Sequence, residues 1–453
     1  MDGFALLNAR ATAKPRREAE FADVTDLSHE GRGVAHVDGK TVFIEDALPG
    51  ERVEWVRFKR GRNFDEGRLE RVIESSPDRV TPQCAHFGVC GGCALQHLST
   101  TKQLEFKQQQ LSEALTRIGR ATPAEILPPL QAGVWNYRRR ARLAARWVPK
   151  KNRTVVGFRE RSAPYIADLK GCAVLRPPAD KLIEPLSLLA SALSVRNRLP
   201  QIEVAVADNA VALVVRVLEP LTPADRELLE QFGRDHDVRI YLQPGGYETV
   251  APLMQNLPAL EYRLPAFDLT LQFEPTDFVQ VNGELNAKMI ERAVELLHPS
   301  AGESVLDLFC GLGNFSLPLA RSGAHIVGVE GDANLIARAR ANAERNGLTS
   351  NTEFFTANLA DESSAAASWA ARRYEKVLLD PPRAGAKEVL SIIARSGATT
   401  VLYISCHPGS LARDAGILVH EHGYRLKAAG VMDMFPHTTH VESAALFERA
   451  ATK

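Results

Sequence analysis

The sequence has 453 residues, of which 45% are apolar and 24% charged, and Lys plus Arg equals Asp plus Glu at 55 each. This length predicts about two to four domains, and the composition is typical of a soluble globular protein. No apolar run approaches the length of a bilayer, which excludes a membrane-spanning chain, and the balanced charge gives no support for nucleic-acid binding.

The N-terminal segment predicts a cytoplasmic protein. Its first residues, MDGFALLNARATAKPRREAE, carry an early acid and an apolar run too short for a signal peptide. Residues 1–17 are expected to be a tail. In the reducing compartment that this implies, the six cysteines are more often metal ligands or catalytic thiols than disulfides.

Residues 18–76 are expected to form a small β-barrel. The run GVAHVDGKTVFIED alternates apolar and polar residues around an Asp-Gly turn, which predicts a hairpin. GERVEWVRFKRGRN and EGRLERVIES supply further short strands. About five short strands in so short a segment are typical of an OB-like barrel, a fold that often binds single-stranded nucleic acid.

A group of cysteines follows the barrel. CAHFGVCGGC holds Cys84, Cys90 and Cys93, and the cysteine that remains outside the C-terminal part is Cys172. Four thiolates fit either zinc or a 4Fe-4S cluster. The spacing slightly favours zinc because structural zinc sites are commoner, although the two-pair C-x2-C pattern of zinc ribbons is absent. We expect this metal site in a central β-rich domain of residues 77–275.

The central segment also carries a strongly basic stretch, Arg138–Arg161, with ten Lys or Arg residues and one acid, Glu160. Aromatic residues lie in or beside it: Trp135, Tyr137, Trp147 and Phe158. This mixture suits phosphate contacts and base stacking, and a solvated face is the simpler alternative. LEFKQQQLSEALTRIG has helical spacing, and the runs TVVGFRE, IEVAVAD, AVALVVRVLE, VRIYLQ and LTLQF predict strands.

Residues 276–453 alternate short apolar runs with helical segments, which predicts an α/β domain with a doubly wound parallel sheet. SVLDLFCGLGNF places a glycine loop between a strand and a helix, where Gly311 and Gly313 allow a ligand to approach. Ser316 replaces the third glycine of the dinucleotide pattern, which favours a ligand without a pyrophosphate, such as S-adenosylmethionine. Glu330 ends the next strand, where a carboxylate can accept from ribose hydroxyls.

Reactive groups are expected at the same edge of this sheet. VLLDPPRAG ends one strand with Asp380, and VLYISCHPG ends the next with Cys406. A thiolate that adds to carbon 6 of uracil makes carbon 5 nucleophilic towards a sulfonium methyl group. A base must then remove the carbon 5 proton, and MFPHTTHVES supplies Glu442, with His437 and His440 close in sequence.

Other interpretations fit parts of this pattern. Asp380-Pro381-Pro382 is similar to the motif of amino methyltransferases, but Arg383 stands where those enzymes place an aromatic residue. Cys310, inside the glycine loop, is expected to fill space rather than react. An RNA-binding or assembly factor with an inactive methyltransferase domain is a further alternative, and the intact set of reactive groups argues against it.

The runs DFVQVN, DLFCGLGNF, DPPRAG, ISCHPGSLARD and HTTHVES resemble the RNA 5-methyluridine methyltransferase family. The N-terminal barrel, which resembles a TRAM domain, and the cysteine loop resemble its 23S rRNA-acting branch. The resemblance implies a class I, Rossmann-like domain that methylates carbon 5 of a uridine in 23S rRNA. It implies Cys406 as nucleophile, Glu442 as base, and S-adenosyl-L-methionine contacts from Gln280, Phe309, Asn314, Glu330, Asn358 and Asp380.

The resemblance further implies that the metal site of Cys84, Cys90, Cys93 and Cys172 is a 4Fe-4S cluster. The expected protein is a monomer that acts away from membranes on 23S rRNA carrying few proteins. The target uridine must flip out of its helix, at a cost of a few kcal/mol. The sequence departs from the family at His407, where Asn is usual, and at Thr439, where Ala is usual; neither change removes a reacting group.

Overall fold

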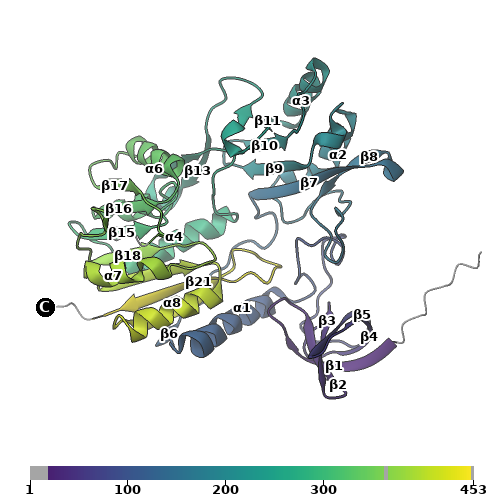
Figure 1. The fold of residues 1–453 in the computed structure, drawn as a ribbon, viewed down its shortest axis with the longest axis horizontal. Coiled ribbons are helices and arrows are strands. Elements are labelled where there is room, and N and C mark those ends of the chain that lie inside the picture. Colours follow the sequence, from purple (N-terminus) through teal and green to yellow (C-terminus); the bar gives the residue numbers. More distant parts are fainter. Residues whose placement is uncertain (1–18, 362–365, 450–453) are drawn as a thin grey trace, which may run out of the picture. The chain divides into compact units, whose positions relative to one another are not determined.

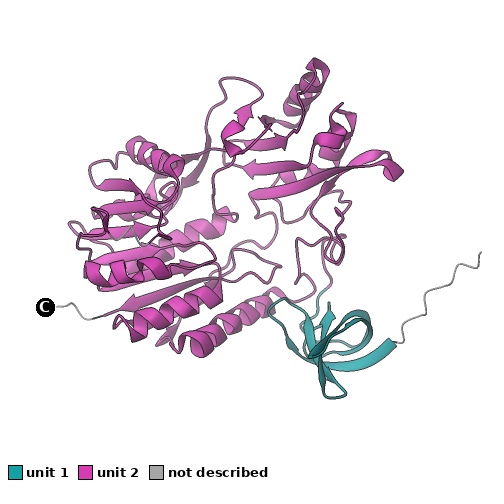
Figure 2. Cartoon of the chain, in the orientation of Figure 1, with its two compact units in different colours: residues 1–80 teal, residues 81–453 magenta. Residues whose placement is uncertain are grey.

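The computed structural model describes residues 19–361 and 366–449, so the expected tail of residues 1–17 lies outside the described residues. The chain divides into two compact units, residues 1–80 and residues 81–453 (Figure 2). Within the described ranges, helices are either too short or too polar to cross a membrane.

The first unit contains a closed five-stranded barrel with the order β1-β2-β3-β5-β4. Its strands are β1 Ala19–Leu27, β2 Gly33–Val37, β3 Lys40–Glu45, β4 Arg52–Arg60 and β5 Phe64–Glu74. The predicted turn between β2 and β3 has Asp38 and Gly39 in the left-handed region, at φ 51° and 76°, which suits a two-residue hairpin. Trp55 is fully buried in the barrel, and a Cβ on Gly67 would come within 2.3 Å of its ring. The predicted barrel is therefore confirmed.

The second unit contains a six-stranded sheet with the order β12-β11-β10-β9-β7-β8. Its strands are β7 Arg140–Val148, β8 Arg153–Gly157, β9 Gln201–Val206, β10 Val211–Arg216, β11 Val238–Gln243 and β12 Ala251–Pro252. Helices α2 (Ile183–Ala192) and α3 (Pro223–His236) bury Leu186 and Leu229 in the core of this sheet. The sequence indicated most of these strands but not the helices, so this region is mixed α/β rather than only β-rich.

An eight-stranded sheet in the same unit has the order β17-β16-β15-β18-β19-β21-β20-β6. Its strands are β6 Glu125–Ile126, β15 Ser304–Leu308, β16 His325–Glu330, β17 Thr352–Thr356, β18 Lys376–Leu379, β19 Thr400–Ser405, β20 Arg425–Met432 and β21 Glu442–Glu448. The strands from β17 to β19 are parallel, and β21 is antiparallel to both its neighbours. The strand order reverses at β15, and ligands bind open α/β sheets at such a point. The predicted doubly wound sheet is confirmed, while β20 and β6 were not expected.

Helices cover both faces of this larger sheet (Figure 1). One face carries α4 Gly283–Leu297, α5 Ser316–Ala320, α6 Ala333–Arg345 and the hairpin of β13 Leu260–Leu264 and β14 Leu269–Phe273. The other face carries α1 Thr100–Ala114, α7 Leu390–Ser396 and α8 Pro408–His420. Helix α1, which follows the cysteine loop, ends in a π turn at Leu115–Gly119 and packs beside α8. Single 3-10 turns lie at Pro149–Lys151, Ala179–Lys181, Arg196–Arg198, Tyr247–Thr249, Pro265–Phe267 and Lys387–Val389.

The segment of residues 77–275 therefore contributes strands to the six-stranded and the eight-stranded sheet, and it also contains the β13–β14 hairpin. The hydrophobic core that contains Leu411 of α8 also contains Leu111 of α1, and β6 pairs with β20 in parallel. The domain boundaries that the sequence indicated, at residues 76 and 275, stay a prediction.

Candidate active site

A cavity of about 650 Å³ opens at the carboxyl ends of the parallel strands of the larger sheet. This volume is typical of a small-molecule site. The lining includes every residue that the sequence assigned to catalysis or to S-adenosyl-L-methionine: Gln280, Phe309, Asn314, Glu330, Asn358, Asp380, Cys406 and Glu442. The expected convergence on one cleft is confirmed, and the individual roles of these residues stay predictions.

The glycine loop lies between β15 and α5, and Gly311 and Gly313 have left-handed φ values of 55° and 97°. Apart from its two chain neighbours, no heavy atom of the described residues lies within 4 Å of the place where a Cβ of Gly311 would be, so the backbone is open to a ligand there. The carboxylate of Glu330 accepts three backbone hydrogen bonds, from the N–H groups of Gly311 at 3.3 Å, Gly331 at 2.6 Å and Asp332 at 3.1 Å. These bonds fix the carboxylate where it can accept from ribose hydroxyls.

Ser316, which replaces the third glycine of the dinucleotide pattern, is fully buried. Its hydroxyl donates a hydrogen bond to the carboxyl group of Asp307 on β15. Burial raises the pKa of Asp307 to about 7. The side chain at this position therefore ties the helix after the loop to the strand before it.

Asn314 is held by two residues that no sequence motif indicated. Its Oδ1 accepts from the Tyr262 hydroxyl at 2.8 Å and from Nδ2 of Asn286 at 3.0 Å, and its Nδ2 donates to Oδ1 of Asn286 at 2.9 Å. These bonds use both lone pairs of Oδ1 and one N–H of Nδ2, so the second N–H of the Asn314 amide can donate to a ligand. Tyr262 comes from β13 and Asn286 from α4, which are 52 and 28 residues away in the chain.

Asp380 and Glu442 are a pair of carboxyl groups with raised pKa values. Burial raises the pKa of Asp380 to about 7. Burial, and then the charge of Asp380, raise the pKa of Glu442 well above its usual range. The amide of Gln280 donates to Asp380 at 3.4 Å. Since two neighbouring carboxylates rarely ionise together, the pair keeps a proton near neutral pH, and an ionised Glu442 is a strong base.

Cys406 lies between β19 and α8. Burial raises the pKa of its thiol to about 11, with further contributions from Glu442 and Asp380, while the guanidinium of Arg383 acts in the opposite direction. The thiol is therefore protonated in the free protein at neutral pH. The Arg383 guanidinium supplies the positive charge that favours the thiolate.

The departure at His407 has a structural reason. His407 is the N-cap of α8, and its Nδ1 accepts from the backbone N–H of Ser410 at 3.1 Å. Asn is among the preferred residues for this role, so the imidazole replaces one acceptor by another. Burial, and then the Arg383 guanidinium, lower the pKa of His407, which keeps the ring neutral and able to accept.

The segment Asp433–Val441, which leads to Glu442, is anchored at His437. The carbonyl of His437 accepts from the N–H of Ala94, just after the cysteine loop, at 2.9 Å. The ring stacks on Trp135 with 4.0 Å between centroids, and its backbone N–H donates to Gln103 at 2.9 Å. Burial lowers the pKa of His437 to about 4, so it is a neutral structural residue.

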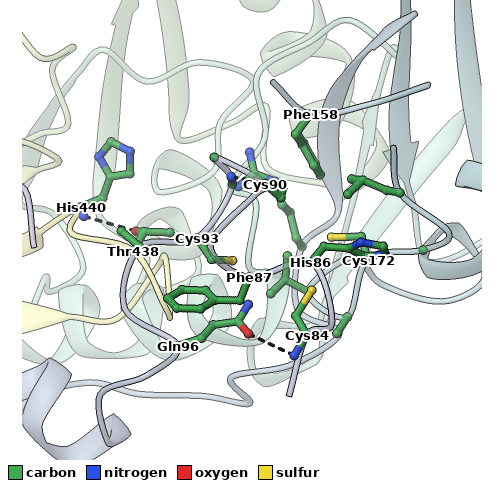
Figure 3. Close-up of a pocket in the computed structure, with 18 of the residues that line it drawn as sticks. Cys84, His86, Phe87, Cys90, Cys93, Gln96, Phe158, Cys172, Thr438 and His440 are labelled. Carbon is green, nitrogen blue, oxygen red and sulfur yellow. Dashed lines mark hydrogen bonds between the residues drawn. The ribbon is translucent and has the colours of Figure 1, made fainter. Parts of the chain in front are cut away.

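A second cavity, of about 300 Å³, is lined by all the predicted metal ligands: Cys84, Cys90, Cys93 and Cys172 (Figure 3). The prediction of an iron-sulfur domain is nevertheless wrong, because no group of three or more His, Cys, Asp or Glu residues within 19–361 and 366–449 is arranged to hold a metal ion. Burial raises the pKa of Cys90 to about 11 and that of Cys93 to about 12. Both thiols are therefore protonated in the free protein at neutral pH.

The basic stretch Arg138–Arg161 is less available for phosphate contacts than its composition suggests. Several of its cations are paired with acids: Arg139 with Asp208, Arg140 and Arg142 with Glu203, and Lys151 and Arg153 with Asp168. Arg146 and Lys150 are exposed. The RNA-binding role of the stretch stays a prediction, and the exposed cations are its best candidates.

The larger cavity fits S-adenosyl-L-methionine in chemistry as well as in size. Its walls include the apolar side chains of Phe309, Leu335 and Leu359, which suit an adenine ring. A cation beside Asp380 and Glu442 lowers the cost of ionising these buried acids, so the site complements a sulfonium.

The chain is similar along nearly its whole length to proteins described as 23S rRNA (uracil(1939)-C(5))-methyltransferase RlmD. The protein of Alkalilimnicola ehrlichii is 49% identical over 98% of this chain and 100% of the relative. The relative in Stenotrophomonas maltophilia is 50% identical, and the match covers 97% of this chain and 100% of the relative. The relative in Xylella fastidiosa is 51% identical, and the match covers 94% of this chain and 96% of the relative.

The family described as tRNA (Uracil-5-)-methyltransferase matches residues 260–450, and the TRAM domain family matches residues 18–55. A solved structure, the Pyrococcus abyssi tRNA (uracil-54, C5)-methyltransferase in complex with S-adenosyl-L-homocysteine, is similar with a TM-score of 0.73. It is 25% identical and covers 94% of this chain and 100% of that chain.

Proposed function

This chain belongs to the RlmD family of 23S rRNA (uracil(1939)-C(5))-methyltransferases, and we propose that it methylates carbon 5 of the corresponding uridine in its own 23S rRNA. The observation that supports this function best is one cavity that joins the Glu330 carboxylate, the Cys406 thiol and the Asp380–Glu442 pair. S-adenosyl-L-methionine supplies a methyl group on a positively charged sulfur. Gln280, Phe309, Asn314, Glu330, Asn358 and Asp380 are the residues that would hold it.

The proposed reaction begins at the Cys406 sulfur. The thiolate forms a bond to carbon 6 of the uracil, and the displaced electron pair makes carbon 5 an enolate carbon. Carbon 5 then forms a bond to the methyl group while the bond from that methyl group to the sulfonium sulfur breaks, so that the sulfur leaves as a neutral thioether. Glu442 then removes the proton from carbon 5. The electrons of that C–H bond restore the double bond between carbons 5 and 6, and the bond from carbon 6 to sulfur breaks, which returns the thiolate.

The protonation states of the cavity suit these steps. Because the pKa of Cys406 is about 11, the thiol must lose its proton before it can add to carbon 6. Because burial raises the pKa of Glu442, its carboxylate has a high affinity for the carbon 5 proton. Cys406 therefore acts in the first step, the addition to carbon 6, and Glu442 acts after methyl transfer, when the proton leaves carbon 5 of the same ring.

The flipped uracil would occupy the side of the cavity formed by Phe435, Pro382 and Arg383. Phe278, also in the lining, is 71% exposed, which suits stacking on a base of the RNA. The barrel of residues 18–76 is the proposed binder of a single-stranded part of the RNA. We further propose that the protein acts as a monomer in the cytoplasm. Its rRNA substrate would carry few bound proteins, because the target uridine must be free to flip.

Nucleoside mass spectrometry on a 23S rRNA fragment tests the proposed function. The wild type with the methyl donor is expected to form 5-methyluridine, and Cys406→Ala is expected to bind the fragment and form none. Normal 5-methyluridine from Cys406→Ala would contradict the assignment of the nucleophile. Methylation at another atom would contradict the reaction itself.

A further inference from the structure

One short segment forms a wall of both cavities described above. The cysteine-lined cavity is bounded by Thr438, Thr439 and His440, and the larger cavity is bounded by Phe435 and Glu442 of the same stretch of chain. Figure 3 shows Thr438 and His440 at the edge of the cysteine-lined cavity. A side chain of this wall can therefore touch groups that belong to the catalytic cavity.

His440 makes such a contact. Its Nδ1 lies 2.9 Å from Nη2 of Arg383, and Arg383 lines the catalytic cavity together with Cys406. A guanidinium is always a donor, so Nδ1 of His440 accepts and the proton of the neutral ring is on Nε2. Desolvation, and then the charge of Arg383, lower the pKa of His440, which keeps Nδ1 free to accept.

The position of His440 is itself fixed by the segment. Its backbone N–H donates to the Thr438 hydroxyl at 3.2 Å, and that hydroxyl donates to the Phe435 carbonyl at 2.9 Å. Its ring lies against the ring of Phe435, with 5.3 Å between centroids. Since His437 anchors the same segment to Trp135 and Gln103, the imidazole of His440 is held in place from both sides.

We propose that His440 is a positioning residue which holds the Arg383 guanidinium beside the Cys406 thiol, so that the cation favours the thiolate. The inference rests on the proposed role of Cys406 as the nucleophile. A free arginine side chain samples many rotamers, and its charge then acts on average from farther away. The hydrogen bond to His440 removes part of this freedom without neutralising the charge, because the imidazole is neutral.

The sign of the effect follows from the charged groups around Cys406. Glu442 on β21 and Asp380 after β18 disfavour the thiolate, and both come close to it in the cavity. Arg383, also after β18, favours it. His407 at the start of α8 is neutral as the N-cap. Arg383 is thus the group whose displacement would leave the thiol facing two acids.

The test is the pH dependence of Cys406 alkylation by iodoacetamide, read by mass spectrometry of the peptide that contains this cysteine. It needs neither RNA nor the methyl donor. His440→Ala is expected to shift the rate profile to higher pH and to lower the rate about three- to tenfold at a pH below the thiol pKa, since one pKa unit is a tenfold change in thiolate. His440→Asn, whose Oδ1 can accept in place of Nδ1, is expected to restore the wild-type profile.

Two further variants make the result specific. In an Arg383→Gln background, His440→Ala is expected to have no additional effect, because His440 acts through Arg383. His325→Ala, at the start of β16, is the matched control and is expected to leave the profile unchanged. An unchanged profile in His440→Ala, or an equal shift with and without Arg383, would overturn the inference. Absence of 5-methyluridine formation by the wild type would instead overturn the proposed function and leave the alkylation profile interpretable.

Discussion

Lys107 of α1 and Asp433 after β20 form a buried ion pair, with 2.6 Å between Nζ and Oδ1. Their side chains are 0% and 4% exposed. The same ammonium donates to the carbonyl of Phe435 at 2.9 Å. The helix that follows the cysteine loop is thereby joined to the start of the segment that ends at the proposed base, Glu442.

Lys107→Met is expected to destabilise the second unit by about 3–5 kcal/mol, because it leaves the Asp433 carboxylate buried without its partner. Urea denaturation followed by circular dichroism measures this change. Lys102→Met on the same helix is the control. It removes a pair with Glu105 whose side chains are 48% and 57% exposed, so a loss of less than about 1 kcal/mol is expected.

The double variant Lys107→Met/Asp433→Leu separates the cost of an unpaired charge from the value of the pair. Replacing both charges by apolar side chains is expected to recover most of the lost stability. Equal losses in Lys107→Met and Lys102→Met would show that the buried pair does not anchor the segment.

Glu330→Gln is expected to weaken the binding of S-adenosyl-L-methionine at least about tenfold, because a neutral amide accepts more weakly from ribose hydroxyls than a carboxylate. Isothermal titration calorimetry measures the affinity. Glu353→Gln on β17, where the side chain is 41% exposed and paired with Arg372, is the matched control and should bind as the wild type does. Unaltered affinity in Glu330→Gln would remove this residue from the proposed ligand contacts.

Asp380→Asn is expected to stabilise the protein at pH 8 but not at pH 4. The pKa of Asp380 is raised to about 7 in the folded state, above its unfolded value near 3.9, so its stabilising contribution is present below about pH 4 and is lost as the pH rises through 7. The asparagine amide does not ionise, so this loss is absent from the variant. The variant is expected to gain about 1.4 kcal/mol in free energy of unfolding at pH 8 for each unit by which folding raises the pKa of Asp380. The melting temperatures of Asp380→Asn and of the wild type, measured at pH 8 and at pH 4, test this prediction.

The control for that experiment is Asp235→Asn on the exposed side of α3. It should leave the pH dependence of the melting temperature as in the wild type. A gain of equal size at both pH values in Asp380→Asn would mean that the residue is not held protonated by its surroundings.

The residues of the larger cavity were predictable because parallel strands end at one edge. Glu330 is the last residue of a strand, and Asp380 and Cys406 each follow one, so the chain order was enough to bring them together. Tyr262 and Asn286 were not predictable, since their bonds to Asn314 depend on how a hairpin and a helix pack on the sheet. Such packing leaves no periodic signal in the sequence.

Polar pairs between residues far apart in the chain could not be predicted from the sequence for a related reason. Lys107 and Asp433 are 326 residues apart, and nothing near either residue indicates the other. Arg383 was noticed only because it occupies the place of an aromatic residue, and its effect on Cys406 depends on the cavity. The cysteines of the second cavity were brought together as expected, but burial raises the pKa of Cys90 and of Cys93, and spacing alone does not report this.

The most direct test of the proposed reaction is a denaturing gel of Glu442→Gln incubated with a 23S rRNA fragment and S-adenosyl-L-methionine. The amide cannot take the carbon 5 proton, so the bond between sulfur and carbon 6 cannot break. A slowly migrating protein–RNA adduct that contains methylated uracil is predicted, and it should be absent from Cys406→Ala/Glu442→Gln. Normal yields of free 5-methyluridine from Glu442→Gln, or no adduct at all, would contradict the account.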